Sequence, residues 1–468
     1  MVPQCDTTRR WRPVMPRIKT VYVCQSCGYV APKWAGRCPD CKSWNTMMEE
    51  QRESSSKSSA KQRTSASLSR DQRPVRLVDV RADGEGEVRM RTGLAELDTV
   101  LGGGLVAGSL VLVGGDPGVG KSTLLLTAAE RLAQRGAPIL YVSGEESVQQ
   151  VHLRAQRLGL GAPHLHLLSH TDFGHVESAI RSLKPTVVVL DSVQTVYLPQ
   201  LPNIPGSVTQ VREVAHRAML LAKSTNTAVF LVGHVTKSGE LAGPKVLEHF
   251  VDTVIHFEGD GRTPLRILRS VKNRFGPAGE LGVFEMVDSG LQEVPDASAR
   301  LLSERVLDAA GTAVVASLEG TRPLLTEVQA LVGRAAPGNP ARTCVGVDRQ
   351  RVAMIAAILG KAGLHLHDRD LFVNAAGGVR LEETAADTAI LAAIASSLRD
   401  QPLDPHTLVF GELGLVGEVR GVGHAQIRLK EAARHGFRRA IVPYTVDEAP
   451  PGLELVRVRS VRDLLAAL

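Results

Sequence analysis

Long apolar runs are absent from this sequence and cysteines are few, which narrows the classes of protein it can represent. No run reaches the roughly 18 consecutive apolar residues that a membrane-spanning helix needs. The first residues include Arg9, Arg10 and Arg12 without an apolar segment, and so do not resemble a secretory signal. With only 6 cysteines in 468 residues, the chain does not have the composition of a disulfide-stabilised protein. Of these cysteines, 4 form two pairs that are close in sequence. Such pairs are typical of metal binding in a reducing compartment, so we expect a cytoplasmic protein.

The length and charge of the chain allow several domains and a nucleic-acid partner. A chain of 468 residues is long enough for about three domains. Its formal net charge of +6 permits binding to nucleic acid without requiring it. Residues 1–17 carry no usable pattern and are expected to form a disordered extension.

The two cysteine pairs lie within residues 18–48. Two residues separate Cys24 from Cys27, two separate Cys38 from Cys41, and ten lie between the pairs. Each pair can place two thiolates on one cation, and together they complete a tetrahedral site. Because so small a module cannot bury a core, metal binding would supply its folding energy. We expect a four-cysteine zinc finger, with iron in a rubredoxin-like site and a redox dithiol as alternatives.

A basic and polar segment follows over residues 49–78. It is rich in Ser, Lys, Arg and Gln and nearly lacks apolar residues, which is typical of a flexible tether. Its excess of positive charge suits loose contact with phosphates, but a solvated linker explains the composition equally well.

The apolar run 110–113 predicts a buried strand, and the glycine-rich loop that follows it matches the pattern G-x-x-x-x-G-K-[ST]. The residues of this loop are Gly115, Asp116, Pro117, Gly118, Val119, Gly120, Lys121, Ser122 and Thr123. Glycines allow a tight bend in which backbone N–H groups face one point, and a helix dipole adds positive charge there. We expect Lys121 to reach the β- and γ-phosphates of ATP and the Ser122 hydroxyl to bind Mg²⁺.

Apolar runs alternate with helical segments within residues 79–292, the expected ATPase domain. Strands are predicted over residues 139–142, 165–168, 186–191 and 228–232. This alternation predicts a mainly parallel sheet covered on both faces, which is the α/β class.

Polar residues at the ends of these strands are candidates for the site, because ligands bind parallel sheets at the carboxyl ends of strands. Asp191 ends one strand and is expected to support Mg²⁺ through water. Glu145 and Glu146 follow another strand, and a carboxylate there can polarise the attacking water. We favour Glu145 as the base, with Glu146 as the alternative. His234 follows a further strand and is either a γ-phosphate sensor or a packed histidine.

Several of these stretches resemble the bacterial RadA (Sms) family. The resemblance rests on residues 92–104, 115–123, 141–147 and 191–195, and it extends from about Ile18 to the C-terminus. Lys272-Asn273-Arg274-Phe275-Gly276 matches the KNRFG motif of that family, which is far more specific than a phosphate loop. The amino-terminal four-cysteine module also agrees with the family.

The resemblance implies a RecA-like ATPase of DNA repair and recombination that uses ATP, Mg²⁺ and Zn²⁺. It further implies a homo-hexameric ring that acts on single-stranded and branched DNA and promotes branch migration with the RecA recombinase. By analogy with related hexameric helicases, Lys272 and Arg274 would reach the ATP of a neighbouring subunit, where cations stabilise the transition state. A basic surface turn is the alternative for this motif. An ATP-gated scaffold and an ATP-dependent protease are the alternatives for the whole chain.

Residues 297–468 mix β-branched runs with helical segments and are expected to form an α+β domain. They resemble the proteolytic domain of Lon proteases, in which a serine–lysine dyad attacks the peptide carbonyl. The Pro-Ser-Ala-Gly turn of those proteases corresponds to Thr384-Ala385-Ala386-Asp387, so alanine replaces the nucleophile. Gln426 stands at the lysine position. The resemblance therefore implies a Lon-like domain without peptidase activity.

Two further features of this domain have competing explanations. Several basic residues suit contact with phosphates, although a solvated basic face explains them equally well. These residues are Arg420, Arg428, Lys430, Arg434, Arg438 and Arg439. Residues 364–368, Leu-His-Leu-His-Asp, are expected to form a strand with outward histidines rather than a metal site.

Overall fold

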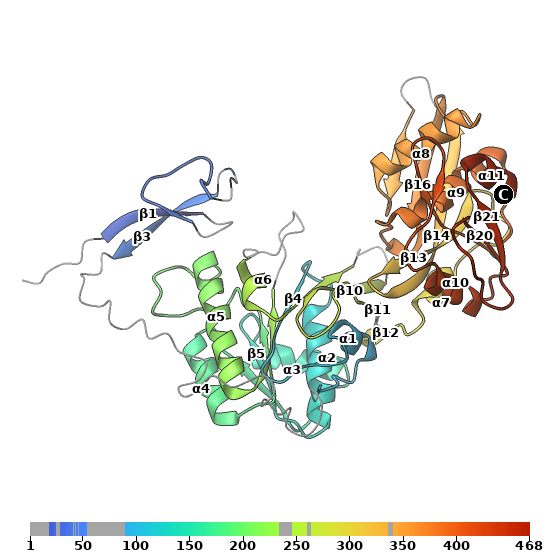
Figure 1. Ribbon diagram of the computed structural model, residues 1–468. Helices are drawn as coiled ribbons and strands as arrows, with labels where there is room; N and C mark the ends of the chain where they lie inside the picture. Colours follow the sequence, from blue (N-terminus) through green and yellow to red (C-terminus); the bar gives the residue numbers. More distant parts are fainter. Residues whose placement is uncertain are drawn as a thin grey trace, which may run out of the picture. The chain divides into compact units, whose positions relative to one another are not determined.

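The computed structural model is drawn in Figure 1, with colours that follow the sequence. It divides into two compact units. One unit holds residues 1–88, 106–114 and 129–252, and the other holds residues 89–105, 115–128 and 253–468. The residues that the structure describes are 18–24, 29–40, 42, 44, 46–53, 89–233, 246–259, 264–335 and 340–468. None of the helices within these residues combines the length and the apolar character that crossing a membrane demands.

The amino-terminal module is a three-stranded antiparallel sheet in the order β2-β1-β3. Its strands are β1 (Ile18–Cys24), β2 (Val30–Ala31) and β3 (Met47–Glu53). β3 is largely charged, and its full-length pairing with β1 makes it a strand where composition favoured a linker. The predicted linker start at residue 49 was therefore wrong, because residues 49–53 belong to this sheet. The expected extension 1–17 and the linker beyond residue 53 lie outside the described residues.

A parallel sheet forms the centre of the first unit. Its strands, in spatial order, are β4 (Leu110–Gly115), β8 (Ala228–Val232), β7 (Val187–Asp191), β5 (Ile139–Ser143) and β6 (Leu165–Ser169). All residues of β4, β5, β7 and β8 are buried, as continuous apolar runs in a parallel sheet should be. The predicted α/β alternation is thus confirmed.

Three helices of this unit begin at side-chain caps. Ser147 and Gln150 form a capping box at α3 (Val148–Arg157). The Asp172 carboxylate accepts from Gly174 N at the start of α4 (Phe173–Leu183), and Ser207 caps α5 (Val208–Thr225). The remaining helices near the sheet are α2 (Lys121–Gln134), which follows the glycine-rich loop, and the short α6 (Val246–Phe250).

The second unit begins with a helix and an antiparallel meander. These elements are α1 (Ala95–Val100), β9 (Thr253–Glu258), β10 (Leu265–Asn273), β11 (Leu281–Val287) and β12 (Gly290–Glu293). The meander is followed by α7 (Ala297–Leu302). Leu265, Leu281 and Val283 of the meander share a small apolar core with Leu324 of the C-terminal sheet.

The C-terminal part of the second unit is a seven-stranded mixed sheet with one large apolar core. Its strands, in spatial order, are β15 (Arg342–Val345), β16 (Arg369–Ala375), β14 (Arg322–Arg334), β13 (Thr312–Glu319), β17 (Thr407–Val409), β20 (Arg439–Pro443) and β21 (Glu454–Val458). The smaller elements are α8 (Arg349–Lys361), η2 (Ala376–Gly378), η3 (Thr384–Ala386), α9 (Asp387–Arg399), β18 (Glu412–Leu413), β19 (Val419–Arg420), α10 (Ala425–Arg434) and α11 (Val461–Ala467). This agrees with the predicted α+β domain.

Residues 364–368 do not form the predicted strand. They lie between α8 and β16 without regular structure. Leu366 is buried, and its carbonyl oxygen accepts from the Arg342 guanidinium at 2.6 Å. Leu366 thus anchors this connection, and His365 and His367 on either side of it are exposed, as predicted.

Candidate functional site

The glycine-rich loop runs from the end of β4 to the start of α2. Lys121 is the first residue of α2 and is 4% exposed. Its ammonium donates to the carbonyl oxygens of Gly115 at 2.7 Å and Asp116 at 2.9 Å. The side chain thus folds back over the loop, where the oxygens of a phosphate would offer a stronger, charged acceptor. This arrangement fits a nucleotide phosphate site.

Two glycines of this loop are required by packing as well as by backbone conformation. A Cβ on Gly115 would lie 2.2 Å from the carbonyl oxygen of Phe257. A Cβ on Gly120, whose φ is +114°, would lie 2.9 Å from Cε of Met286. The loop is therefore seated closely against β9 and β11. From the sequence we assigned the glycines to the bend alone, because the strands they touch lie far along the chain.

An acidic residue predicted for the site lies at the carboxyl end of β7. Asp191 is 8% exposed, and its carboxylate accepts from the Tyr141 hydroxyl at 2.6 Å. Burial, followed by the nearby charge of Asp191, raises the pKa of Tyr141 well above its usual value. Tyr141 therefore stays a neutral donor that fixes the Asp191 carboxylate. Tyr141 was not among the predicted site residues.

The two candidate bases after β5 have different partners. Ser192, the residue after Asp191, donates its hydroxyl to the Glu145 carboxylate at 2.6 Å. Glu146 instead forms an ion pair with Arg154 of α3. Gly144 lies beneath them, and a Cβ there would be 2.1 Å from the Thr195 hydroxyl. Glu145 and Asp191 are thus brought together through Ser192, whereas Glu146 is held by α3.

The strand arrangement places these groups at one edge of the parallel sheet. β5 pairs with β7 so that Ser143 lies opposite Asp191. β7 pairs with β8, and β8 pairs with β4, all in parallel. The carboxyl ends of β4, β5 and β7 therefore share an edge, and the phosphate loop directly continues β4. This is the edge at which ligands bind parallel sheets. His234 lies outside the described residues.

The KNRFG motif begins at the end of β10, after a β-bulge. Ser270 pairs with Ile255 and Lys272 pairs with Val254, so Val271 is the extra residue. A bulge reverses which face the following side chains occupy. Lys272 therefore lies on the face of Arg269 and His256, while Asn273 lies on the opposite face and contacts Thr253. Arg274 is exposed in the turn that follows.

Two of the four predicted metal ligands lie within the described residues. Cys24 and Cys38 are 0% and 1% exposed and belong to one small cluster with Ala31 and Met47. The Thr46 hydroxyl lies 3.2 Å from the sulfur of Cys24. Two buried thiols in so small a module fit a structural zinc site. The other predicted ligands, Cys27 and Cys41, lie outside the described residues.

The positions expected to correspond to a peptidase dyad carry no nucleophile and no base. Ala385 is buried in η3, just before α9. Gln426 lies on α10, and its amide donates to the carbonyl oxygen of Glu448 at 2.9 Å. The neighbouring hydroxyl, Thr384, donates to Glu412 at 2.8 Å.

Arg428 does not belong to the basic face that we predicted. It is 2% exposed, and its guanidinium donates to both oxygens of Glu383 at 2.6 and 2.7 Å. Lys430 and Arg438 are exposed, whereas Arg434 is ion-paired with Asp296. The error arose because the partner of Arg428 lies 45 residues earlier in the chain, where no local pattern reveals it.

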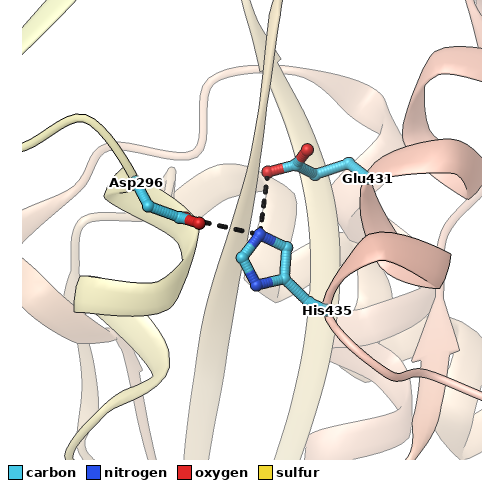
Figure 2. A group of neighbouring side chains, drawn as sticks. All are labelled: Asp296, Glu431 and His435. Atoms are coloured by element: carbon cyan, nitrogen blue, oxygen red, sulfur yellow. Dashed lines mark hydrogen bonds and ion pairs between the residues drawn. The ribbon is translucent and has the colours of Figure 1, made fainter.

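An ion-pair cluster that sequence reasoning missed connects α7 with α10 (Figure 2). His435 Nε2 lies 3.4 Å from Asp296 and 3.2 Å from Glu431. The Arg434 guanidinium contacts the same two carboxylates at 3.0 and 3.3 Å, and Ser298 donates to Glu431 at 2.6 Å. Because the Arg434 guanidinium already pairs with both carboxylates, we interpret the cluster as a network that links the two helices.

Three family models match separate parts of the chain. The one described as an AAA domain matches residues 72–240, and the one described as a rubredoxin metal binding domain matches residues 22–49. A third, described as subunit ChlI of Mg-chelatase, matches residues 334–446. These matches agree with the predicted ATPase core, zinc-binding module and Lon-like C-terminal domain.

Curated relatives cover nearly the whole chain. The DNA repair protein RadA of Halalkalibacterium halodurans is 49% identical over 458 residues, which are 96% of this chain and 99% of the relative. The protein of the same name from Bacillus subtilis is 48% identical, with 96% of this chain and 99% of the relative covered. That of Pseudomonas aeruginosa is also 48% identical, and the coverage is 97% and 100%. The chain belongs to the RadA family of DNA repair proteins.

Proposed function

We propose that this protein is a DNA-dependent ATPase of recombinational repair. It would bind single-stranded and branched DNA as a homo-hexameric ring and promote branch migration and strand extension together with the RecA recombinase. The observation that carries the proposal is the combination, in one RadA-family chain, of a complete phosphate loop and a bulged strand that leads into KNRFG. The phosphate loop would serve ATP hydrolysis. The bulged strand would present Lys272 and Arg274 to a neighbouring subunit.

Residues of the phosphate loop hold ATP in this proposal. The backbone N–H groups of residues 115–123 cradle the phosphates, and Lys121 exchanges its two carbonyl acceptors for the β- and γ-phosphates. Ser122 and Asp191 are the residues that would hold Mg²⁺, Ser122 directly and Asp191 through water. When bound, Mg²⁺ neutralises charge that develops on the phosphate oxygens. Tyr141 keeps the Asp191 carboxylate oriented.

Glu145 is the proposed general base, in preference to Glu146. A base must lie within reach of the attacking water to accept its proton, and an ion pair with arginine holds a carboxylate to another partner. Glu146 has such a pair with Arg154, whereas Glu145 contacts the hydroxyl of Ser192 beside Asp191. The expected base therefore lies next to the expected magnesium ligand.

Lys272 and Arg274 are proposed to act on the ATP of a neighbouring subunit. Cations that approach the γ-phosphate stabilise the charge of the transition state. Supplying them from another subunit couples hydrolysis to movement within the ring. The bulge at Val271 supports this role, because it turns Lys272 away from the face that Ser270 and Asn273 occupy.

The terminal domains are proposed to serve assembly and DNA contact. Cys24, Cys27, Cys38 and Cys41 would hold zinc as a structural site. The C-terminal domain would act as a Lon-like scaffold without peptidase activity, since Ala385 and Gln426 stand at the dyad positions. Lys430 and Arg438 are exposed and are proposed to contact DNA from its basic side.

The steady-state ATPase rate with and without single-stranded DNA tests the proposal. Wild type should be stimulated by DNA, Lys121→Ala should lose hydrolysis, and Lys272→Ala should lose the stimulation. A wild-type rate that DNA leaves unchanged at moderate salt would contradict the DNA-dependent motor. If Lys121→Ala still supports strand extension on branched DNA, the protein is instead an ATP-gated scaffold for other recombination proteins.

A further inference from the structure

The KNRFG turn is held from within by Asn273. The side-chain oxygen of Asn273 accepts from the backbone N–H of Phe275 at 3.0 Å and from the Thr253 hydroxyl at 3.2 Å. The first of these bonds closes an Asx turn, which fixes the backbone around Arg274. The second ties the turn to Thr253, the first residue of β9. Arg274 thus projects from a turn whose shape is set on one side by the sheet.

Arg89 holds the same turn from a distant part of the chain. Its guanidinium donates through Nη2 to the carbonyl oxygen of Phe275 at 2.5 Å and through Nη1 to the carbonyl oxygen of Gly102. A single planar fork therefore joins the turn to the triple-glycine loop 102–104. Lysine has no such fork and could satisfy the two acceptors only as a point charge.

The two loops also touch through glycines. A Cβ on Gly102 would lie 3.2 Å from Cα of Gly276, and a Cβ on Gly276 would lie 3.0 Å from Cα of Gly102. The φ of Gly102 is +81°, which side-chain-bearing residues rarely adopt. Neither loop can approach the other as closely with a larger residue, so Arg89 bridges a contact that depends on both glycines.

The segment that carries Arg89 is itself well anchored. The neighbouring residue, Met90, exchanges two backbone hydrogen bonds of 2.8 Å with Leu105, across the base of the glycine loop. Asp98 of α1 accepts from the backbone and the hydroxyl of Thr92, each at 2.8 Å. Hydrogen bonds thus fix the conformation of residues 89–105, and Arg89 is the first residue of this segment.

We propose that Arg89 is a positioning residue that sets where the KNRFG turn presents Lys272 and Arg274. It acts through the carbonyl oxygens of Phe275 and Gly102. The inference rests on the proposed role of Lys272 and Arg274 toward a neighbouring ATP. The proposal also assigns a role to residues 92–104, a motif that phosphate binding does not explain. These residues hold Arg89 in place, and Arg89 in turn holds the KNRFG turn.

Single variants separate positioning from binding. In Arg89→Ala the DNA-stimulated kcat should fall at least about tenfold, since a displaced catalytic group costs on the order of 100-fold for 1 Å. The affinity of the phosphate loop for a fluorescent ATP analogue should remain within about twofold, because the Arg89 guanidinium bonds to the KNRFG turn and to the glycine loop 102–104. Arg89→Lys should also be defective. Arg91→Ala removes the same charge from an exposed position two residues away, so it controls for the loss of charge alone and should reduce the stimulation far less than Arg89→Ala does.

Variants of Asn273 and a double mutant distinguish positioning of the turn from a general effect on folding. Asn273→Asp keeps the oxygen that closes the turn and should retain most of the stimulation, whereas Asn273→Ala should not. Arg89→Ala combined with Arg274→Ala should be no worse than Arg274→Ala alone, because both changes remove one function. The thermal midpoint of each protein is measured alongside to confirm that it is folded.

Mixed rings give the sharpest test. A subunit with Arg89→Ala keeps an intact phosphate loop, and one with Lys121→Ala keeps an intact turn. If the turn serves a neighbour, rings assembled from both proteins should recover part of the hydrolysis that each lacks alone. Wild-type stimulation in Arg89→Ala, or a loss of ATP affinity equal to the loss of kcat, overturns the inference. Wild-type behaviour of Lys272→Ala and Arg274→Ala would instead overturn the proposed function on which it rests.

Discussion

The guanidinium of Arg322, at the start of β14, donates to the carboxylate of Glu96 in α1 at 2.5 Å. The same carboxylate accepts from the backbone N–H of Val283 in β11 at 2.8 Å. Arg322 also donates to the carbonyl oxygen of Pro295 at 3.0 Å. One ion pair therefore connects α1, the meander that carries KNRFG and the C-terminal sheet.

Removing this pair should destabilise the protein measurably. The side chains of Arg322 and Glu96 are 21% and 9% exposed, so Arg322→Ala leaves a nearly buried carboxylate without its cation. We expect a loss of about 3 kcal/mol in the free energy of unfolding, measured by urea denaturation. The comparison is Arg181→Ala, whose exposed pair with Glu177 should contribute less than about 1 kcal/mol. Equal losses in the two variants would contradict the ranking by burial.

Arg428 and Lys430 lie on the same helix but should affect different properties. Arg428→Ala leaves Glu383 without its bidentate partner and should cost about 3–5 kcal/mol of stability. Lys430 is exposed, and Lys430→Ala should change stability by less than about 0.5 kcal/mol. If the basic side contacts DNA, Lys430→Ala should weaken binding and reduce the salt dependence by about one ion. This prediction is checked by measuring the affinity for DNA at several salt concentrations, under conditions in which wild type and both variants are equally folded.

The sequence predicted the elements whose signals are local. The strands β4, β5, β7 and β8 are continuous apolar runs and appear within a residue or two of their predicted bounds. The phosphate loop lies where its motif places it, between a strand and a helix, because glycines and lysine at fixed spacing specify that turn.

The features that escaped prediction depend on partners far along the chain. β3 is a strand because β1 pairs with it, although its own residues are mostly charged. Arg428 is buried because Glu383 meets it, and Tyr141 is part of the site because Asp191 lies on the adjacent strand. The bulge at Val271 likewise exists only in the register between β9 and β10. Such contacts are tertiary, and a single sequence carries no local trace of them.

The hydrogen bond from Tyr141 to Asp191 should contribute stability that alkaline pH removes. The pKa of Tyr141 is raised in the folded protein, so the folded state holds this proton more tightly than the unfolded state does. Stability from this group is therefore complete below the unfolded pKa of about 10 and is lost as pH rises toward the folded value. Tyr141→Phe should flatten the decline in the urea midpoint between about pH 9 and 11. It should also slow ATP hydrolysis at neutral pH, since the Asp191 carboxylate loses its anchor.

The metal in the amino-terminal module should depend on Cys24 but not on Cys344. Cys24 is fully buried among the few apolar residues of the module, whereas Cys344 lies in β15 of the C-terminal sheet. Because the described part of the module has only a small apolar cluster, losing one thiolate should remove both the zinc and the local fold. Elemental analysis of purified protein should find about one zinc per chain in wild type and Cys344→Ser, and almost none in Cys24→Ser. Hydrogen exchange of β1 and β3 should rise only in Cys24→Ser, because their pairing depends on the metal. Iron in place of zinc would keep the four-thiolate geometry but assign a rubredoxin-like centre, and retention of zinc by Cys24→Ser would contradict the ligand set.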